Sequence, residues 1–154
     1  MGETLVLGLG NTLRGDDGVG SAVIASLQTE QSLPPEVDLL DAGTPGLDIV
    51  LLLEGYRRAL IVDAANMGCA PGQWRRFAAE SLMLENGNGG LQGTLHNAGL
   101  VEALQLANAL NTAPPELIIY GVQPENLDWT VGLSEAVREA IPAIQRAVLN
   151  ELTE

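Results

Sequence analysis

The sequence contains no lysine, a single cysteine and a single histidine. One cysteine cannot form an intrachain disulfide, so the composition favours a reducing, cytoplasmic setting. One cysteine and one histidine also cannot build the usual structural zinc site. No apolar run approaches about 18 residues, so no transmembrane helix and no membrane partner are expected. The length of 154 residues predicts a single domain, residues 1–154.

Basic residues are scarce as well. The chain has 20 acidic residues against 7 basic ones, all of them arginine, and a formal net charge of -13. Nucleic-acid binding depends on neutralising phosphates with lysine and arginine, so we expect no nucleic-acid partner. Two interpretations of the acidity remain open: it attracts a cation or a basic partner segment, or it only maintains solubility.

Apolar runs typical of strands alternate with segments of helical periodicity. The predicted strands are residues 4–9, 37–40, 59–63, 73–78 and 116–122. The predicted helices are residues 17–27, 47–54, 98–110 and 134–149, the second covered on most sides and the last capped by Ser134. Continuous apolar strands alternating with helices predict an α/β three-layer sandwich, in which a mostly parallel sheet of about five strands lies between helices.

Three aspartates are predicted at one edge of this sheet. Asp17, Asp41 and Asp63 each follow or end a predicted strand. In open parallel sheets, ligands bind beyond the carboxyl ends of the strands, where the strand order reverses. If the first strand lies between the second and the third, the three loops converge on one crevice.

The segment 8–20, GLGNTLRGDDGVG, begins like a dinucleotide-binding loop. Leu13 occupies the third glycine position, however, and Asp16 and Asp17 follow. Two carboxylates about 4 Å from a phosphate would repel it by a few kcal/mol even at an effective dielectric near 20. No lysine is present for a Walker A loop. The segment therefore favours a cation, although the two aspartates also suit the N-terminus of the following helix as caps.

Asp17, Asp63 and His96 form the most informative set. Two carboxylate oxygens and one imidazole nitrogen can hold a divalent first-row metal with positions left open. Alternatively, the two aspartates share a proton and act as a hydrolytic pair. Each residue alone also has an ordinary structural interpretation: Asp63 paired with a backbone N–H or an arginine, His96 starting a helix, and Asp41 shaping a turn.

Nucleophilic catalysis has little support in this sequence. Cys69 has neither a basic neighbour nor a nearby histidine to activate it, and it is interpreted as a small packed residue. With no lysine and one histidine, serine and cysteine triads are unsupported.

Several segments, in order along the chain, resemble the hydrogenase maturation endopeptidases, which trim the C-terminal tail from the large subunit of nickel–iron hydrogenases. The matching segments are residues 8–20, 41–46, 60–64, 95–97, 121–125 and 131–134. The resemblance implies that Asp17, Asp63 and His96 are metal ligands. It also implies that the turn carrying Asp41, Gly43 and Thr44 recognises substrate, with Ala42 in place of a glycine.

The resemblance further implies a cytoplasmic endopeptidase whose partner is the large-subunit precursor. Nickel arrives bound to that precursor and is not a permanent cofactor, and the protease is expected to be a monomer that docks transiently. Either nickel activates the scissile carbonyl or water, or Asp17 or Asp63 acts as general base. Two alternatives are a non-catalytic nickel- and precursor-binding chaperone and a small Rossmann-like nucleotide-binding module.

Overall fold

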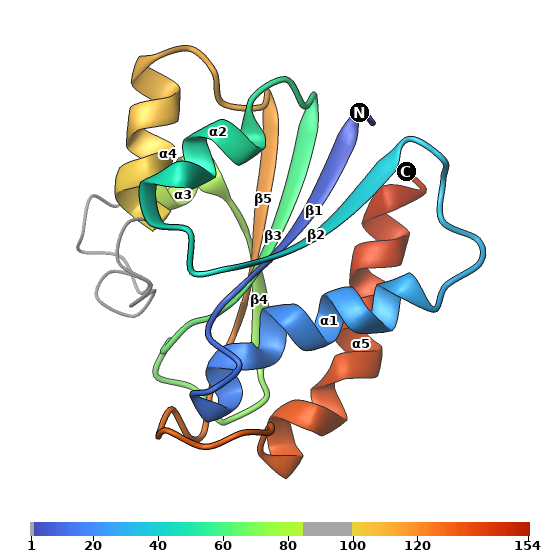
Figure 1. Ribbon diagram of the computed structural model, residues 1–154, viewed down its shortest axis with the longest axis vertical. Helices are drawn as coiled ribbons and strands as arrows, with labels where there is room; N and C mark the ends of the chain where they lie inside the picture. Colours follow the sequence, from blue (N-terminus) through green and yellow to red (C-terminus); the bar gives the residue numbers. More distant parts are fainter. Residues whose placement is uncertain (1, 85–99) are drawn as a thin grey trace.

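A five-stranded sheet forms the centre of the molecule, in the order β2-β1-β3-β5-β4 (Figure 1). The computed structural model describes residues 2–84 and 100–154. The strands are β1 (Thr4–Leu9), β2 (Val37–Gly43), β3 (Arg58–Ala64), β4 (Trp74–Ala78) and β5 (Glu116–Val122). All pairings are parallel except that of β4 with β5. The mostly parallel sheet predicted from the sequence is confirmed.

Helices cover both faces of the sheet (Figure 1). On one face lie α1 (Val19–Gln28) and α5 (Glu135–Leu152), and on the other α2 (Ile49–Leu53), α3 (Ala79–Leu84) and α4 (Leu100–Ala109). Side chains alternate along β1, so that Leu5 and Leu7 pack towards α2 and α4 while Val6 packs towards α1 and α5. This alternation produces two buried apolar layers and confirms the three-layer sandwich.

The order of the strands reverses at β1. The chain passes from β1 to β2 on one side of it and then to β3 on the other. The loops that follow β1, β2 and β3 therefore open at one edge of the sheet, as the sequence predicts for Asp17, Asp41 and Asp63.

The predicted start of the first helix, at residue 17, was wrong. Residues 17–27 do not form one helix, because a 3-10 turn, η1 (Gly15–Gly18), precedes α1. Neither Asp16 nor Asp17 caps α1: its N-cap is Gly18, which makes no side-chain hydrogen bond. The carboxylate of Asp16 instead binds the distant residue Ser134.

The second predicted strand and helix also differ from the structure. Strand β2 continues past residue 40 to Gly43, because Asp41 pairs with Gly8, and a bulge at Ala42 brings Gly43 opposite Leu9. Ala42 is absent from the residues with positive φ, so this position does not demand glycine.

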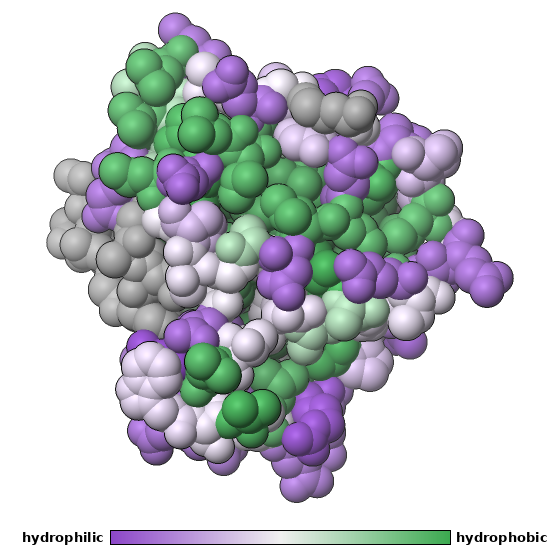
Figure 2. Space-filling view, in the orientation of Figure 1, coloured by the Kyte–Doolittle hydropathy of each residue, from purple (hydrophilic) through white to green (hydrophobic). Residues whose placement is uncertain are grey.

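The predicted helix 47–54 consists of a 3-10 turn, η2 (Gly46–Asp48), and the short α2. It is not covered on most sides: Leu47 and Leu51 remain 55% and 69% exposed, because a helix of this length buries only the side that meets the sheet. Figure 2 shows apolar side chains gathered on the surface over α2 and α4.

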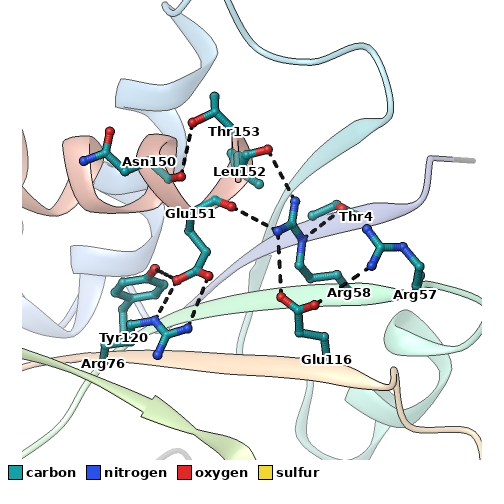
Figure 3. A network of polar contacts seen from close by, with 10 residues as sticks. All are labelled: Thr4, Arg57, Arg58, Arg76, Glu116, Tyr120, Asn150, Glu151, Leu152 and Thr153. Atoms are coloured by element: carbon teal, nitrogen blue, oxygen red, sulfur yellow. Dashed lines mark hydrogen bonds and ion pairs between the residues drawn. The ribbon is translucent and has the colours of Figure 1, made fainter.

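Polar contacts fasten the C-terminal end of α5 to the sheet (Figure 3). Arg58 donates to the main-chain oxygens of Glu151 and Leu152 at 3.0 and 3.4 Å, which satisfies carbonyls at the end of α5. The carboxylate of Glu151 accepts from Arg76 Nε at 2.6 Å and from the Tyr120 hydroxyl at 3.0 Å. These contacts lower the pKa of Glu151, chiefly through the Arg76 hydrogen bond.

Glu151→Gln should weaken the pH dependence of stability in acid. The lowered pKa means that ionised Glu151 stabilises the fold fully above its ordinary value of 4.5, and that this stabilisation is lost as pH falls through the folded-state pKa. The wild type should therefore lose more of its free energy of unfolding between about pH 5 and pH 3 than the variant does. At pH 7 the variant should be less stable by about 1 kcal/mol.

Urea unfolding at several pH values measures this difference. Glu139→Gln, at an exposed glutamate on the same helix, controls for the loss of a charge. Equal acid-side slopes for the wild type and Glu151→Gln would contradict the assignment.

Candidate active site

Asp17 and Asp63 are both buried at the carboxyl edge of the sheet. Asp63 is the next-to-last residue of β3 and is 0% exposed, while Asp17 lies in η1 and is 1% exposed. The turn η1 packs directly against β3. The fold therefore places two carboxylates that are separated in the sequence by 46 positions on adjoining elements of this edge.

The loop after β1 closes around Asp17. The main-chain N–H of Asn11 donates to Asp17 Oδ2 at 2.7 Å. Gly10 has a φ of 127°, and a Cβ at this position would overlap the carbonyl oxygen of Asp17. Only glycine lets the loop turn so tightly at this position. The carboxylate of Asp63 also binds the main chain: its Oδ1 accepts a hydrogen bond from the N–H of Ala64 at 2.9 Å.

Helix α1 approaches the sheet closely beside these carboxylates. A Cβ on Gly20 would lie 2.6 Å from the carbonyl oxygen of Val62 and would also meet the backbone of Leu9. The absence of a side chain at Gly20 allows α1 to sit directly over β1 and β3. This packing places η1, and with it Asp17, next to the end of β3.

The predicted substrate turn lines a pocket of about 390 Å³. Its wall consists of Asp41, Ala42, Gly43 and Thr44 on one side and Gly10, Asn11 and Thr12 on the other. The two sides are joined by a hydrogen bond from Gly10 N–H to the Gly43 oxygen at 2.8 Å. Asp41 accepts a hydrogen bond from the hydroxyl of Ser21 on α1 at 2.5 Å. Because Asn11 also binds Asp17, the pocket and the Asp17 carboxylate share one loop.

The sequence analysis did not predict that two buried polar residues at this edge, Asp16 and Gln123, hold neighbouring loops in place through hydrogen bonds. Asp16, 0% exposed, was interpreted as a helix cap but binds the segment 125–134. Gln123, 7% exposed, holds the loop after β3: its Oε1 accepts from Met67 N–H at 2.6 Å and its Nε2 donates to Asn66 at 3.1 Å. For Gln123, the available signal was a polar residue placed directly after a buried strand.

His96 lies outside the described residues, as does the start of the predicted helix 98–110. Within residues 2–84 and 100–154, no three histidine, cysteine, aspartate or glutamate side chains gather closely enough to hold a metal ion. Cys69 is half-buried, with its Sγ 3.6 Å from Gln123 Oε1, in agreement with a packed rather than a nucleophilic residue. In the same part of the chain, no helix has the length and apolar character needed to span a membrane.

The fold and the edge residues together define a class of protein. This is a three-layer α/β protein with buried carboxylates and a polar pocket at the carboxyl edge of its sheet. Such carboxylates can bind cations or transfer protons. The family model described as "Hydrogenase maturation protease" matches residues 21–151. The chain belongs to the hydrogenase maturation protease family and is a hydrolase of the peptidase class, as its resemblance to that family predicted.

Known proteins similar to this chain agree with the assignment. The "Hydrogenase expression/formation protein HupD" of Bradyrhizobium diazoefficiens is 34% identical over 145 residues, which cover 93% of this chain and 74% of the relative. The "Hydrogenase 2 maturation protease" of Escherichia coli K12 is 30% identical over 151 residues, 97% of this chain and 90% of the relative. The solved structure of the hydrogenase maturating endopeptidase HybD from E. coli superimposes with a TM-score of 0.86 at 29% identity, covering 98% of this chain and 92% of that one.

Proposed function

We propose that this protein is the endopeptidase that removes the C-terminal extension of a nickel–iron hydrogenase large-subunit precursor after nickel insertion. The observation that carries the proposal is the burial of Asp17, in η1, and Asp63, near the end of β3, at one edge of the sheet. The pocket lined by Asp41, Gly43 and Thr44 lies at the same edge. Relatives carry the names of hydrogenase maturation proteases.

Nickel enters this proposal as part of the substrate. Asp17, Asp63 and His96 would contact the nickel of the precursor with two carboxylate oxygens and one imidazole nitrogen. Three such ligands leave coordination positions open, and cysteine thiolates of the precursor would fill them. The protease would therefore bind nickel well only in the loaded precursor, and cleavage would depend on successful metal insertion.

The hydrolytic step has two routes. In one, the substrate's nickel polarises the scissile carbonyl or activates water. In the other, Asp17 or Asp63 takes the proton of the attacking water while nickel only positions the tail. In both, water attacks directly, because Cys69 packs against Gln123 and no serine or cysteine triad is evident in the sequence.

The pocket beside Asp17 is the proposed site for the tail. Asp41 and Thr44 bring polar side chains to it, and the space at the side-chain position of Gly43 is open, with no atom of the described residues within 4 Å. The protein is proposed to act in the cytoplasm as a monomer that docks transiently on the precursor.

Two other functions make different predictions. A maturation chaperone would bind the loaded precursor without releasing a peptide. A nucleotide-binding module would need the amides of the glycine loop for a phosphate, but Asn11 N–H already donates to the carboxylate of Asp17. The geometry of this loop therefore favours the protease.

Intact-mass analysis of a precursor tests the proposal. We expect loss of a C-terminal peptide from a nickel-loaded large-subunit precursor incubated with this protein, and no loss from the nickel-free precursor. A stable complex with the loaded precursor but no change in mass would support the chaperone instead. Equal cleavage of both precursor forms would refute the dependence on nickel.

A further inference from the structure

The side chain of Asp16 binds a part of the chain more than 100 residues away. Its Oδ2 accepts from the main-chain N–H groups of Glu125 at 2.8 Å and Asn126 at 3.1 Å. Ser134 donates twice, from its N–H to Oδ1 at 2.7 Å and from its hydroxyl to Oδ2 at 2.8 Å. We call Asp16, Glu125, Asn126 and Ser134 the Asp16 cluster.

Main-chain contacts reinforce this cluster. The N–H of Gly15 donates to the Thr130 oxygen at 2.7 Å, and the N–H of Asp16 donates to the Asn126 oxygen at 2.8 Å. Gly15 has a φ of 55°, and a Cβ there would lie 2.5 Å from the Asn126 oxygen. The turn η1 and the segment 125–134 are therefore held at close range by both side-chain and backbone hydrogen bonds.

Asp17 follows Asp16 in the same 3-10 turn. The Asp16 cluster holds the backbone immediately before Asp17, while Asn11 N–H binds the Asp17 carboxylate at 2.7 Å. The Asp16 cluster and the hydrogen bond from Asn11 therefore both contribute to the orientation of Asp17. No residue of the Asp16 cluster lines the pocket of residues 10–12 and 41–44.

We propose that Asp16 is a positioning residue for Asp17, and the inference rests on the proposed peptidase function. Both carboxylate oxygens of Asp16 accept hydrogen bonds, so both terminal atoms of the side chain at this position must be acceptors. Asparagine has a single acceptor oxygen and would turn an NH2 group towards at least one of these donors. The resulting shift of η1 would displace Asp17 from its reacting position, whereas no residue of the Asp16 cluster lines the pocket proposed for the tail.

Asp16→Asn tests the inference through separate values of kcat and KM for a nickel-loaded precursor. We expect kcat to fall by about 30- to 100-fold, because small displacements of a reacting group cost rate steeply. KM should rise by much less than kcat falls, because no residue of the Asp16 cluster lines the pocket proposed for the tail. A wild-type kcat in a folded Asp16→Asn protein would overturn the inference.

A matched control separates positioning from lost stability. Val148→Ala removes buried core atoms from α5, away from the carboxyl edge, and should lower the melting temperature while kcat stays at the wild-type value. If Val148→Ala lowers kcat as much as Asp16→Asn at a similar loss of stability, the inference is wrong.

Ser134→Ala provides a second variant should Asp16→Asn fail to fold. It removes the hydroxyl donor to Asp16 but keeps the main-chain donor, so kcat should fall by about three- to tenfold, with a smaller rise in KM. An unchanged kcat in this variant would overturn the inference. If the wild type releases no peptide from the loaded precursor, the proposed function itself fails and the inference falls with it.

Discussion

Asp63→Asn should abolish processing of a nickel-loaded precursor while leaving the protein folded. Asparagine keeps an oxygen that can accept the Ala64 N–H now bound by Asp63 Oδ1, so the end of β3 should retain its shape. The substitution removes the negative charge that either a metal contact or a general base requires. We expect the rate to fall by about 10³-fold, within the range ascribed to a positioned acid or base. Time courses of tail release, followed by intact mass, measure the effect.

Asp128→Asn serves as the matched control. Asp128 is exposed on the segment 125–134, and its replacement changes the net charge by the same amount. This variant should process the precursor at the wild-type rate, so a loss confined to Asp63→Asn cannot arise from charge alone. Wild-type processing by a folded Asp63→Asn protein would exclude a catalytic or metal-binding role for Asp63.

Gly20→Ala should strongly destabilise the fold. A Cβ at residue 20 would lie 2.6 Å from the Val62 oxygen and would also meet the backbone of Leu9, atoms that belong to strands and cannot rotate away. Alanine normally favours a helix over glycine by about 1 kcal/mol. Forcing α1 off the sheet costs about 3 kcal/mol and outweighs this gain. The net loss of about 2 kcal/mol should lower the melting temperature by roughly 4 to 8 °C, as expected for a chain of this size.

Thermal and urea unfolding measure the loss, with Gln28→Ala as control. Gln28 is exposed at the other end of α1, so its replacement should leave stability within about 0.5 kcal/mol. If Gly20→Ala proves as stable as the wild type, α1 does not pack as closely on β1 and β3 as the structure indicates.

Local signals in the sequence were sufficient to predict much of the fold. Strand β5 was predicted with its observed bounds, Glu116–Val122, because Pro114 and Pro115 precede a continuous apolar run. The N-terminus of α5 was also correct: Ser134 accepts a hydrogen bond from Val137 N–H at 3.4 Å, as an N-cap should. Both features depend on residues close in the chain, whose preferences act without help from distant partners.

The wrong predictions concern features whose structure depends on residues far away in the sequence. Strand β2 was ended too early because its last residues look like a turn, yet pairing with Gly8 and Leu9 of β1 extends them into the sheet. Asp16 was interpreted as a helix cap, the ordinary local role of an aspartate before a helix. Its real partners, including Ser134, are more than 100 positions away, and no local pattern identifies them.

The sequence by itself determined the three-layer α/β class, the placement of Asp17, Asp41 and Asp63 at the carboxyl ends of strands, and the resemblance to the hydrogenase maturation proteases. These follow from periodicity and short motifs, which are local properties of the chain. Only the tertiary structure decided that η1 packs against β3, that Asn11 both lines the pocket of residues 10–12 and 41–44 and binds Asp17, and that Asp16 binds the start of α5. Such contacts depend on strand order and on how closely α1 approaches the sheet, and packing determines both.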